Sequence, residues 1–147
     1  MGILRSMGQT ARAYAQFRSQ KLGPYGLPGN QCLYIRAVLQ HPGITQDELA
    51  ETLVFSRSNV SRTLASLESA GFVRQERSES DKRNLLVFPT EKAEEVLPKI
   101  DETSRDFFSA IARDLSPEER RLLEALCETV CERAKEVIRD AKASDLL

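Results

Sequence analysis

Two predicted helices lie so close together in the sequence that they constrain the fold more than any other feature. Thr45 and Glu48, in the stretch TQDE, form a capping box, which predicts that a short helix begins there. Ser56 is the next residue suited to an N-cap, and the helix that it begins is expected to run to about Ala70, where Gly71 ends it. Because only the stretch LVFS separates the two helices, the spacing is that of a helix-turn-helix.

The segment that follows has the pattern of a β-hairpin. FVRQE and LLVF are two short strand-like stretches, and the polar stretch RSESDKRN lies between them. We expect Pro89 to end the second strand and Thr90 to begin a long helix that runs to about Asp114. The chain is therefore predicted to be mainly α-helical with a small β-hairpin, which follows the helix-turn-helix as a wing.

Further helices are predicted on both sides of this unit. A helix over about residues 3–21 is followed by LGPYGLPGN, whose prolines and glycines break it, and then by a helix through QCLYIRAVLQ. The second of these helices is expected to bury Leu33, Ile35, Val38 and Leu39, or a subset of them. Ser116, Pro117 and Glu119 supply a complete start signal for the last helix.

The last helix carries an apolar stripe along one face. A monomer of 147 residues could cover such a stripe only in part, and large apolar patches are rare on monomers. The stripe therefore predicts a homodimer. Its residues are Leu122, Leu126, Val130 and Val137.

Composition narrows the class of protein. At 41% hydrophobic and 29% charged residues, the chain is typical of a globular protein, and no apolar run approaches the roughly 20 residues of a membrane helix. Residues 55–83 hold more bases than acids although the net charge is −1, and such a local excess suits nucleic acid. One histidine and three cysteines, without a metal cluster, a phosphate loop or an activated nucleophile, argue against an enzyme, a cofactor or a metal site. A reduced, cytoplasmic setting is expected.

The second helix of the helix-turn-helix has one face without any acid. Val60, Leu64 and Leu67 face the core, and the opposite side carries small hydroxyls, one alanine and Arg62. A slim face of this kind fits a DNA major groove about 12 Å wide, whereas a merely solvated face would carry Glu–Lys pairs. The outward residues are Ser58, Ser61, Arg62, Ala65 and Ser69, and the candidate DNA-binding residues are Ser56, Arg57, Ser58, Asn59, Ser61 and Arg62.

The hairpin loop mixes bases with acids. Arg77, Lys82 and Arg83 are candidate DNA contacts, and Glu79 and Asp81 lie beside them. An acid close to an arginine can hold the guanidinium in one pose before DNA arrives, and we assign this wing-orienting role to Asp81. An arginine held in this way suits a narrow minor groove. The alternative interpretation is that this hairpin loop is only a solvated polar loop and does not contact DNA.

These residues resemble the MarR family of bacterial transcriptional regulators. The resemblance rests on TQDELA, SRSNVSRTL, LESAGFV and the wing DKR followed by TEKA, and it extends more weakly to YGLPGNQCLYIRAVLQHPG. It covers about residues 25–94. Pro89 and Ala93 stand where the family usually has leucine and glycine, a departure at the strand-to-helix corner that leaves the DNA-facing side unaffected.

The resemblance implies a homodimer on double-stranded DNA. Residues 25–94 would form the winged helix-turn-helix lobe, and residues 1–24 and 95–147 the dimerisation helices of a single MarR-like domain. It also implies a repressor that binds a pseudo-palindromic operator and is released by a small, often phenolic, ligand. Arg83 would enter the minor groove beside Asp81. Candidate ligand-pocket residues are Phe17, Arg18, Tyr25, Tyr34 and His41.

Two other functions remain open from the sequence. A winged-helix protein-interaction module without DNA binding would have the same fold, and duplex binding would distinguish it. A thiol-redox-sensing regulator would use Cys32, Cys127 or Cys131, but the oxidant-sensing branch of the family has its cysteine near the first helix, where this chain has none. Cys127 and Cys131 share a helix face and are expected to pack in the core or an interface.

Overall fold

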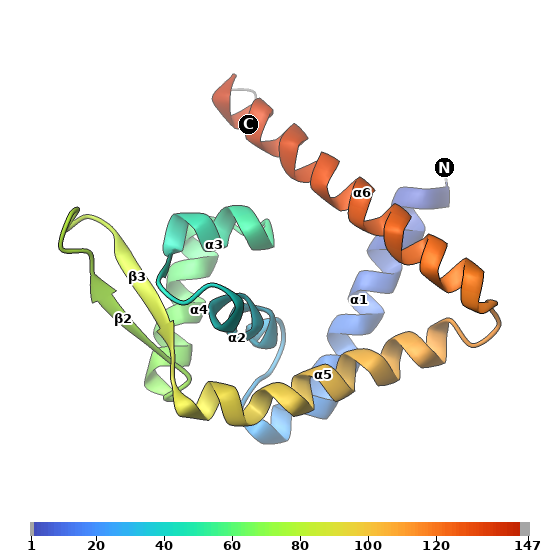
Figure 1. Ribbon diagram of the computed structural model, residues 1–147, viewed down its shortest axis with the longest axis horizontal. Helices are drawn as coiled ribbons and strands as arrows, with labels where there is room; N and C mark the ends of the chain where they lie inside the picture. The colour runs from blue at the N-terminus through green and yellow to red at the C-terminus, as the bar shows by residue number, and fades with distance from the viewer. Residues whose placement is uncertain (1, 145–147) are drawn as a thin grey trace. The chain divides into compact units, whose positions relative to one another are not determined.

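The structure is a computed structural model that describes residues 2–144 (Figure 1). It forms two compact units, Met1–Phe108 and Ser109–Leu147. The outermost residues of the expected dimerisation segments, residue 1 and residues 145–147, lie outside the described part. The elements in chain order are α1 (Gly2–Leu22), the 3-10 helix η1 (Gly23–Tyr25), α2 (Gln31–Gln40), β1 (Ile44–Thr45), α3 (Gln46–Leu53), α4 (Arg57–Ser69), β2 (Val73–Arg77), β3 (Leu85–Pro89), α5 (Glu91–Ile111) and α6 (Pro117–Ala143).

The helix starts follow the capping signals of the sequence. Thr45 and Ser116 each take part in a complete capping box, with Glu48 and Glu119 as the reciprocal acids. The Ser56 hydroxyl accepts a hydrogen bond from the backbone N–H of Asn59 at 3.2 Å. These hydrogen bonds confirm the predicted helix starts. The starts could be predicted because capping depends on residues that are neighbours in the sequence.

The sheet has one strand more than the sequence indicated. β2 and β3 form the expected antiparallel hairpin, and the two-residue β1 pairs with the other edge of β3, so the order is β1-β3-β2. β1 was missed because two residues carry no alternation pattern. β3 ends at Pro89 as expected, and Pro89 itself is the last residue of the strand, opposite Val73.

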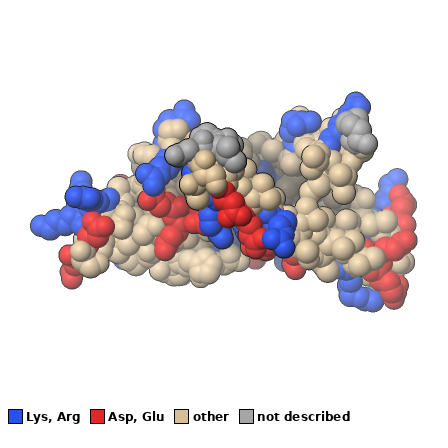
Figure 2. All heavy atoms as spheres, turned by 90° about the horizontal axis from the view of Figure 1, so that it is seen from above, with Lys and Arg blue, Asp and Glu red and all other residues tan. Residues whose placement is uncertain are grey.

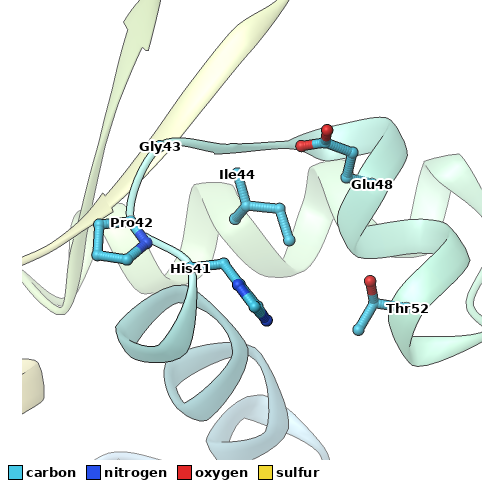
Figure 3. Close-up of a pocket in the computed structure, with 6 residues that line it drawn as sticks. All are labelled: His41, Pro42, Gly43, Ile44, Glu48 and Thr52. Carbon is cyan, nitrogen blue, oxygen red and sulfur yellow. The ribbon is translucent and has the colours of Figure 1, made fainter.

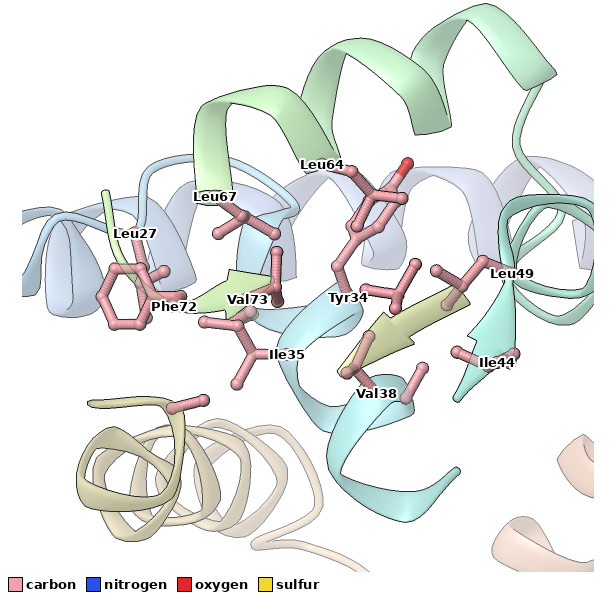
Figure 4. Close-up of a cluster of buried hydrophobic side chains, with 14 of the residues drawn as sticks. Leu27, Tyr34, Ile35, Val38, Ile44, Leu49, Leu64, Leu67, Phe72 and Val73 are labelled. Carbon is pink, nitrogen blue, oxygen red and sulfur yellow. The ribbon is translucent and has the colours of Figure 1, made fainter. Parts of the chain in front are cut away.

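The core of the first unit is built around α2 (Figure 4). Ile35 and Val38 are buried as expected, whereas Leu33 and Leu39 are only partly buried. Cys32 and Tyr34, which the helical pattern did not select, are fully enclosed. α2 is covered on several sides by α3, α4 and the sheet, so it buries more than one stripe.

Side chains at the start of α5 tie this helix to the end of α4. The Thr90 hydroxyl donates to the carbonyl of Gly71 at 2.6 Å, and Lys92 Nζ donates to the carbonyl of Ala70 at 2.6 Å. The Lys92 ammonium also lies 4.4 Å from the centre of the Phe72 ring. A cation at the C-terminal end of α4 is favoured by the helix dipole. These contacts hold the hairpin, which begins at Val73, in a defined place next to α4.

The second unit consists mainly of α6. Among its described residues none is buried, and its apolar stripe is open, with Leu122 and Val137 each 58% exposed. In the described part of the chain, no helix has the length and apolar character needed to span a membrane.

Candidate DNA interface

The inner face of α4 is fixed by the core and leaves the opposite face free. Val60, Leu64 and Leu67 are completely buried, as the sequence predicted. The residues of the outer face are all exposed: Ser58, Ser61, Arg62, Ala65 and Ser69. No acid lies on this face, so the described residues offer hydroxyls and a guanidinium to whatever meets it.

Two arginines of α4 are held close to the helix. Arg62 Nε donates to the carbonyl of Ser58 at 3.3 Å, which keeps the guanidinium along the outer face. Arg57 makes a 3.0 Å ion pair with Asp47 of α3, and both side chains are more than half exposed. Exposed pairs of this kind contribute little to stability, so a phosphate could replace Asp47 as the partner at small cost. No local pattern in the sequence pointed to Asp47, because this ion pair joins two different helices.

The wing carries its bases on a turn that is closed by hydrogen bonds. Arg77 Nη1 donates to the carbonyl of Lys82 at 2.9 Å, and the backbone N–H of Ser78 donates to the carbonyl of Asn84 at 2.9 Å. Arg77, Lys82 and Arg83 are exposed. Figure 2 shows Lys and Arg side chains at the end of the molecule from which the hairpin projects in Figure 1, with acids beside them.

Asp81 contacts the backbone of this turn. One carboxylate oxygen accepts from the backbone N–H of Arg83 at 3.0 Å, and the other accepts from the side-chain amide of Asn84 at 3.4 Å. The Ser78 hydroxyl accepts from the backbone N–H of Asp81 at 3.3 Å. The contact to Arg83 is therefore made at its backbone, whereas the sequence analysis placed it at the guanidinium. Asp81 shapes the chain from which the Arg83 side chain projects.

Comparisons with known proteins agree with this geometry. The sequence model of the MarR family matches residues 25–84. The HTH-type transcriptional regulator YybA of Bacillus subtilis is 30% identical over 87% of this chain and 85% of its own length. The chain belongs to the MarR family of transcriptional regulators.

A further relative matches this chain in sequence, and two solved structures match it in fold. The transcriptional regulator HosA of Escherichia coli is 34% identical over 63% of this chain and 68% of its own length. The crystal structure of MarR is 26% identical, with a TM-score of 0.88 over 95% of each chain. A putative MarR-family regulator from Listeria monocytogenes, crystallised with a 26mer DNA, is 25% identical, with a TM-score of 0.89 over 97% of this chain and 95% of that one. The winged-helix fold of this MarR-family chain is thus a DNA-binding fold.

The five candidate ligand-pocket residues of this MarR-family chain lie in different places. His41 lines an open pocket of about 460 Å³, and Tyr34 is enclosed in the core with its hydroxyl directed at α4. Tyr25 is exposed, whereas Phe17 and Arg18 lie on α1, where the Phe17 ring approaches Phe107. The whole pocket lining is His41, Pro42, Gly43, Ile44, Glu48 and Thr52 (Figure 3).

Arg18 has the least ordinary environment of the five. It is only 5% exposed, its Nη2 donates to Asn30 Oδ1 at 2.5 Å, and its Nε has no hydrogen-bond partner. Among the described residues no carboxylate forms an ion pair with it. Its guanidinium lies 4.3 Å from the centre of the Tyr14 ring, and that ring stacks on Phe107 at 4.8 Å. The sequence could not show that this arginine meets an amide and an aromatic ring, because these neighbours lie in separate segments or turns of the chain.

The three cysteines differ in environment. Cys32 is buried, and its burial raises the pKa of its thiol, an effect that the nearby guanidinium groups of Arg18 and Arg36 oppose. Cys127 and Cys131 are exposed on α6. Because the thiolate is the reactive form, a raised pKa makes Cys32 a poor oxidant sensor.

Proposed function

We propose that this MarR-family chain is a homodimeric repressor that binds a pseudo-palindromic operator and is released by a small anionic ligand. The observation that carries the DNA part is the acid-free outer face of α4, which the hairpin with the exposed wing arginines follows in the chain. α4 would enter the major groove, and Arg83 would enter the adjacent minor groove. The site of action is the cytoplasm, where the DNA is.

The uncovered stripe of α6 supports the homodimer. A second copy would cover the apolar side chains that the described chain leaves exposed, and α1 adds Ile3 and Leu4, at 71% and 79% exposed. A two-fold dimer carries two copies of α4, which meet two half-sites about 34–36 Å apart along the duplex. The operator of such a dimer is an imperfect palindrome.

The buried guanidinium of Arg18, which forms no ion pair among the described residues and whose Nε has no hydrogen-bond partner there, supports an anionic effector. A buried charge without a counter-ion is costly, and a carboxylate would supply two acceptors for its N–H groups. The rings of Tyr14 and Phe107 beside it favour an aromatic acid, including the phenolic acids implied by the family resemblance. Arg18, with Tyr14 and Asn30, is the proposed effector site.

Selection of duplexes from a random pool, followed by binding assays on the selected operator, tests the DNA part. We expect a palindromic site, and we expect Arg62→Ala to cost about 1–3 kcal/mol per half-site on that operator and much less on random duplex. Arg105→Ala, on the exposed face of α5, is the matched control and should leave both affinities unchanged. A chain that binds no duplex at low salt would instead support the protein-interaction module.

Titration with benzoate and hydroxybenzoates tests the effector part. We expect these acids to weaken operator binding by the wild type, and we expect Arg18→Gln to abolish the response while operator binding in their absence persists. Neutral benzyl alcohol is the control ligand and should have no effect, since it brings no charge for Arg18. An unchanged response in Arg18→Gln would contradict the assignment of the effector site.

A further inference from the structure

Two hydroxyl groups meet the side-chain carbonyl of Asn59 in the first turn of α4. The Tyr34 hydroxyl donates to Asn59 Oδ1 at 2.6 Å, and the Thr63 hydroxyl donates to the same oxygen at 3.4 Å. A carbonyl oxygen has two lone pairs, so these two hydrogen bonds use its accepting capacity. The orientation of the Asn59 amide is thereby determined by residues on two different helices.

Tyr34 is held rigidly where it makes this contact. Its side chain is 0% exposed, and its ring stacks on Phe55 with 5.6 Å between the ring centres and 4° between the planes. Burial raises the pKa of Tyr34, an effect that the Thr63 hydroxyl opposes, so the phenol remains a donor at neutral pH. Figure 4 shows its hydroxyl pointing toward α4. A buried hydroxyl must have a partner, which makes Asn59 the group that Tyr34 depends on.

The remaining polar atom of Asn59 is its amide nitrogen. Among the described residues none accepts a hydrogen bond from it, and the side chain is only partly buried. Asn59 lies in the N-terminal turn of α4, the part of such a helix that contacts base edges. An amide nitrogen only donates, so this position offers DNA a donor and no acceptor.

We propose that Tyr34 is a positioning residue that makes Asn59 present its amide N–H groups to DNA, so that α4 selects a base edge offering a hydrogen-bond acceptor at this position. The accepting edges in the major groove are N7 and O6 of guanine, N7 of adenine and O4 of thymine, whereas cytosine presents an amino donor there. This inference rests on the proposed function, since it assumes that α4 enters the major groove. It adds a residue of the core to the determinants of specificity.

Binding measurements on Tyr34→Phe, Asn59→Ala and the double variant test the proposal. Tyr34→Phe removes only the hydroxyl and keeps the ring on Phe55. Each variant is titrated against the operator that the wild type selects, the operator with cytosine at the position read by Asn59, and random duplex. Thr103→Val is the matched control, because it also removes a buried hydroxyl hydrogen bond, at 2.8 Å to the carbonyl of Lys99, but within α5 and away from α4.

The expected result is a loss of discrimination between the selected operator and the cytosine-substituted operator, and this loss should depend on Asn59. Asn59→Ala should lower the operator-to-cytosine affinity ratio about 3- to 10-fold per half-site, the value of one hydrogen bond. Tyr34→Phe should lower it by part of that factor, the double variant should match Asn59→Ala, and Thr103→Val should leave it unchanged. Additive losses in the double variant, or equal losses on operator and random duplex, would overturn the positioning role.

A second variant keeps the test independent of whether Tyr34→Phe folds. In Asn59→Asp, Tyr34 still donates to one carboxylate oxygen, and the other oxygen turns an acceptor toward the DNA. Selection from a random pool should then favour cytosine or adenine, whose amino groups donate, at one position of each half-site. Unchanged base preferences at every position would refute the proposal alone, whereas a wild type that selects no duplex would overturn the proposed function as well.

Discussion

At the scale of single residues, Asp81 and Glu79 form a matched pair of acids in the wing. Asp81 accepts two hydrogen bonds from the turn, whereas Glu79 makes no hydrogen bond or ion pair to any described residue. Coulomb's law alone predicts that removing either charge strengthens DNA binding. We expect Glu79→Ala to do so and Asp81→Ala to weaken binding to operator and random duplex alike, because the turn that carries Arg83 loosens. DNA titrations at a fixed salt concentration measure the affinities of both variants. If the two variants strengthened DNA binding equally, Asp81 would have no orienting role.

Arg83 is expected to act through charge and groove width, since the minor groove shows a degenerate pattern of acceptors. Arg83→Ala should weaken binding to operator and random duplex to similar extents. It should also make the dependence of log affinity on log salt shallower, by about one unit for each phosphate that the guanidinium neutralises in the wild type. Arg62→Ala, which is expected to affect the operator selectively, provides the comparison in the same titration series. A weakening confined to the operator would show that Arg83 reads bases.

The cysteines should divide into two reactivity classes. Burial and the raised pKa of Cys32 keep its thiol protonated and covered, so it should react with a thiol reagent much more slowly than Cys127 and Cys131, and only at higher pH or after unfolding. Colorimetric titration of the native and the denatured chain measures this. Replacing all three by serine should leave duplex affinity nearly unchanged under reducing conditions. Fast modification of Cys32 in the native chain would revive the thiol-sensor alternative.

At the scale of elements, the turn of the helix-turn-helix stores backbone strain. Val54 has φ 57° and ψ 46°, the left-handed conformation that a β-branched residue strongly disfavours. Its side chain is 51% exposed, so truncating it removes little packing. Val54→Gly should raise the free energy of unfolding by about 1 kcal/mol. Thr52→Gly, in the helical part of α3, should lower it by about 0.5 kcal/mol, and urea denaturation distinguishes the two signs.

At the scale of the whole molecule, the uncovered stripe of α6 decides the oligomeric state. Leu126→Glu places a charge in the stripe and should convert the expected dimer to a monomer, with loss of operator binding because only one half-site can then be held. Arg121→Glu also makes α6 more acidic, about 140° around the helix from Leu126 and therefore off the stripe, and is the control. Sedimentation at micromolar protein concentration measures the oligomeric state of both variants. A wild type that sediments as a monomer would contradict the homodimer.

Features that depend on residues close together in the sequence could be predicted from the sequence. The capping residues Thr45, Ser56 and Ser116 begin their helices where expected, and the 3.6-residue period correctly separated the buried Val60, Leu64 and Leu67 from the outer face of α4. Capping and helical periodicity are local, so one segment carries all the information. The family resemblance then indicated the class of protein, which the comparisons confirmed.

Features that depend on which distant segments meet could be settled only by the tertiary structure. The pairing of β1 with β3, the hydrogen bond of the buried Arg18 to Asn30, and the contact of Tyr34 with Asn59 each join residues from separate segments. The family resemblance made Tyr34 and Arg18 candidate pocket residues, and the structure adds that the Tyr34 hydroxyl donates to Asn59 of α4 and that the Arg18 guanidinium lies beside the Tyr14 ring. The reason is physical: whether a buried polar group is satisfied depends on partners that the fold brings to it, and no local pattern specifies those partners.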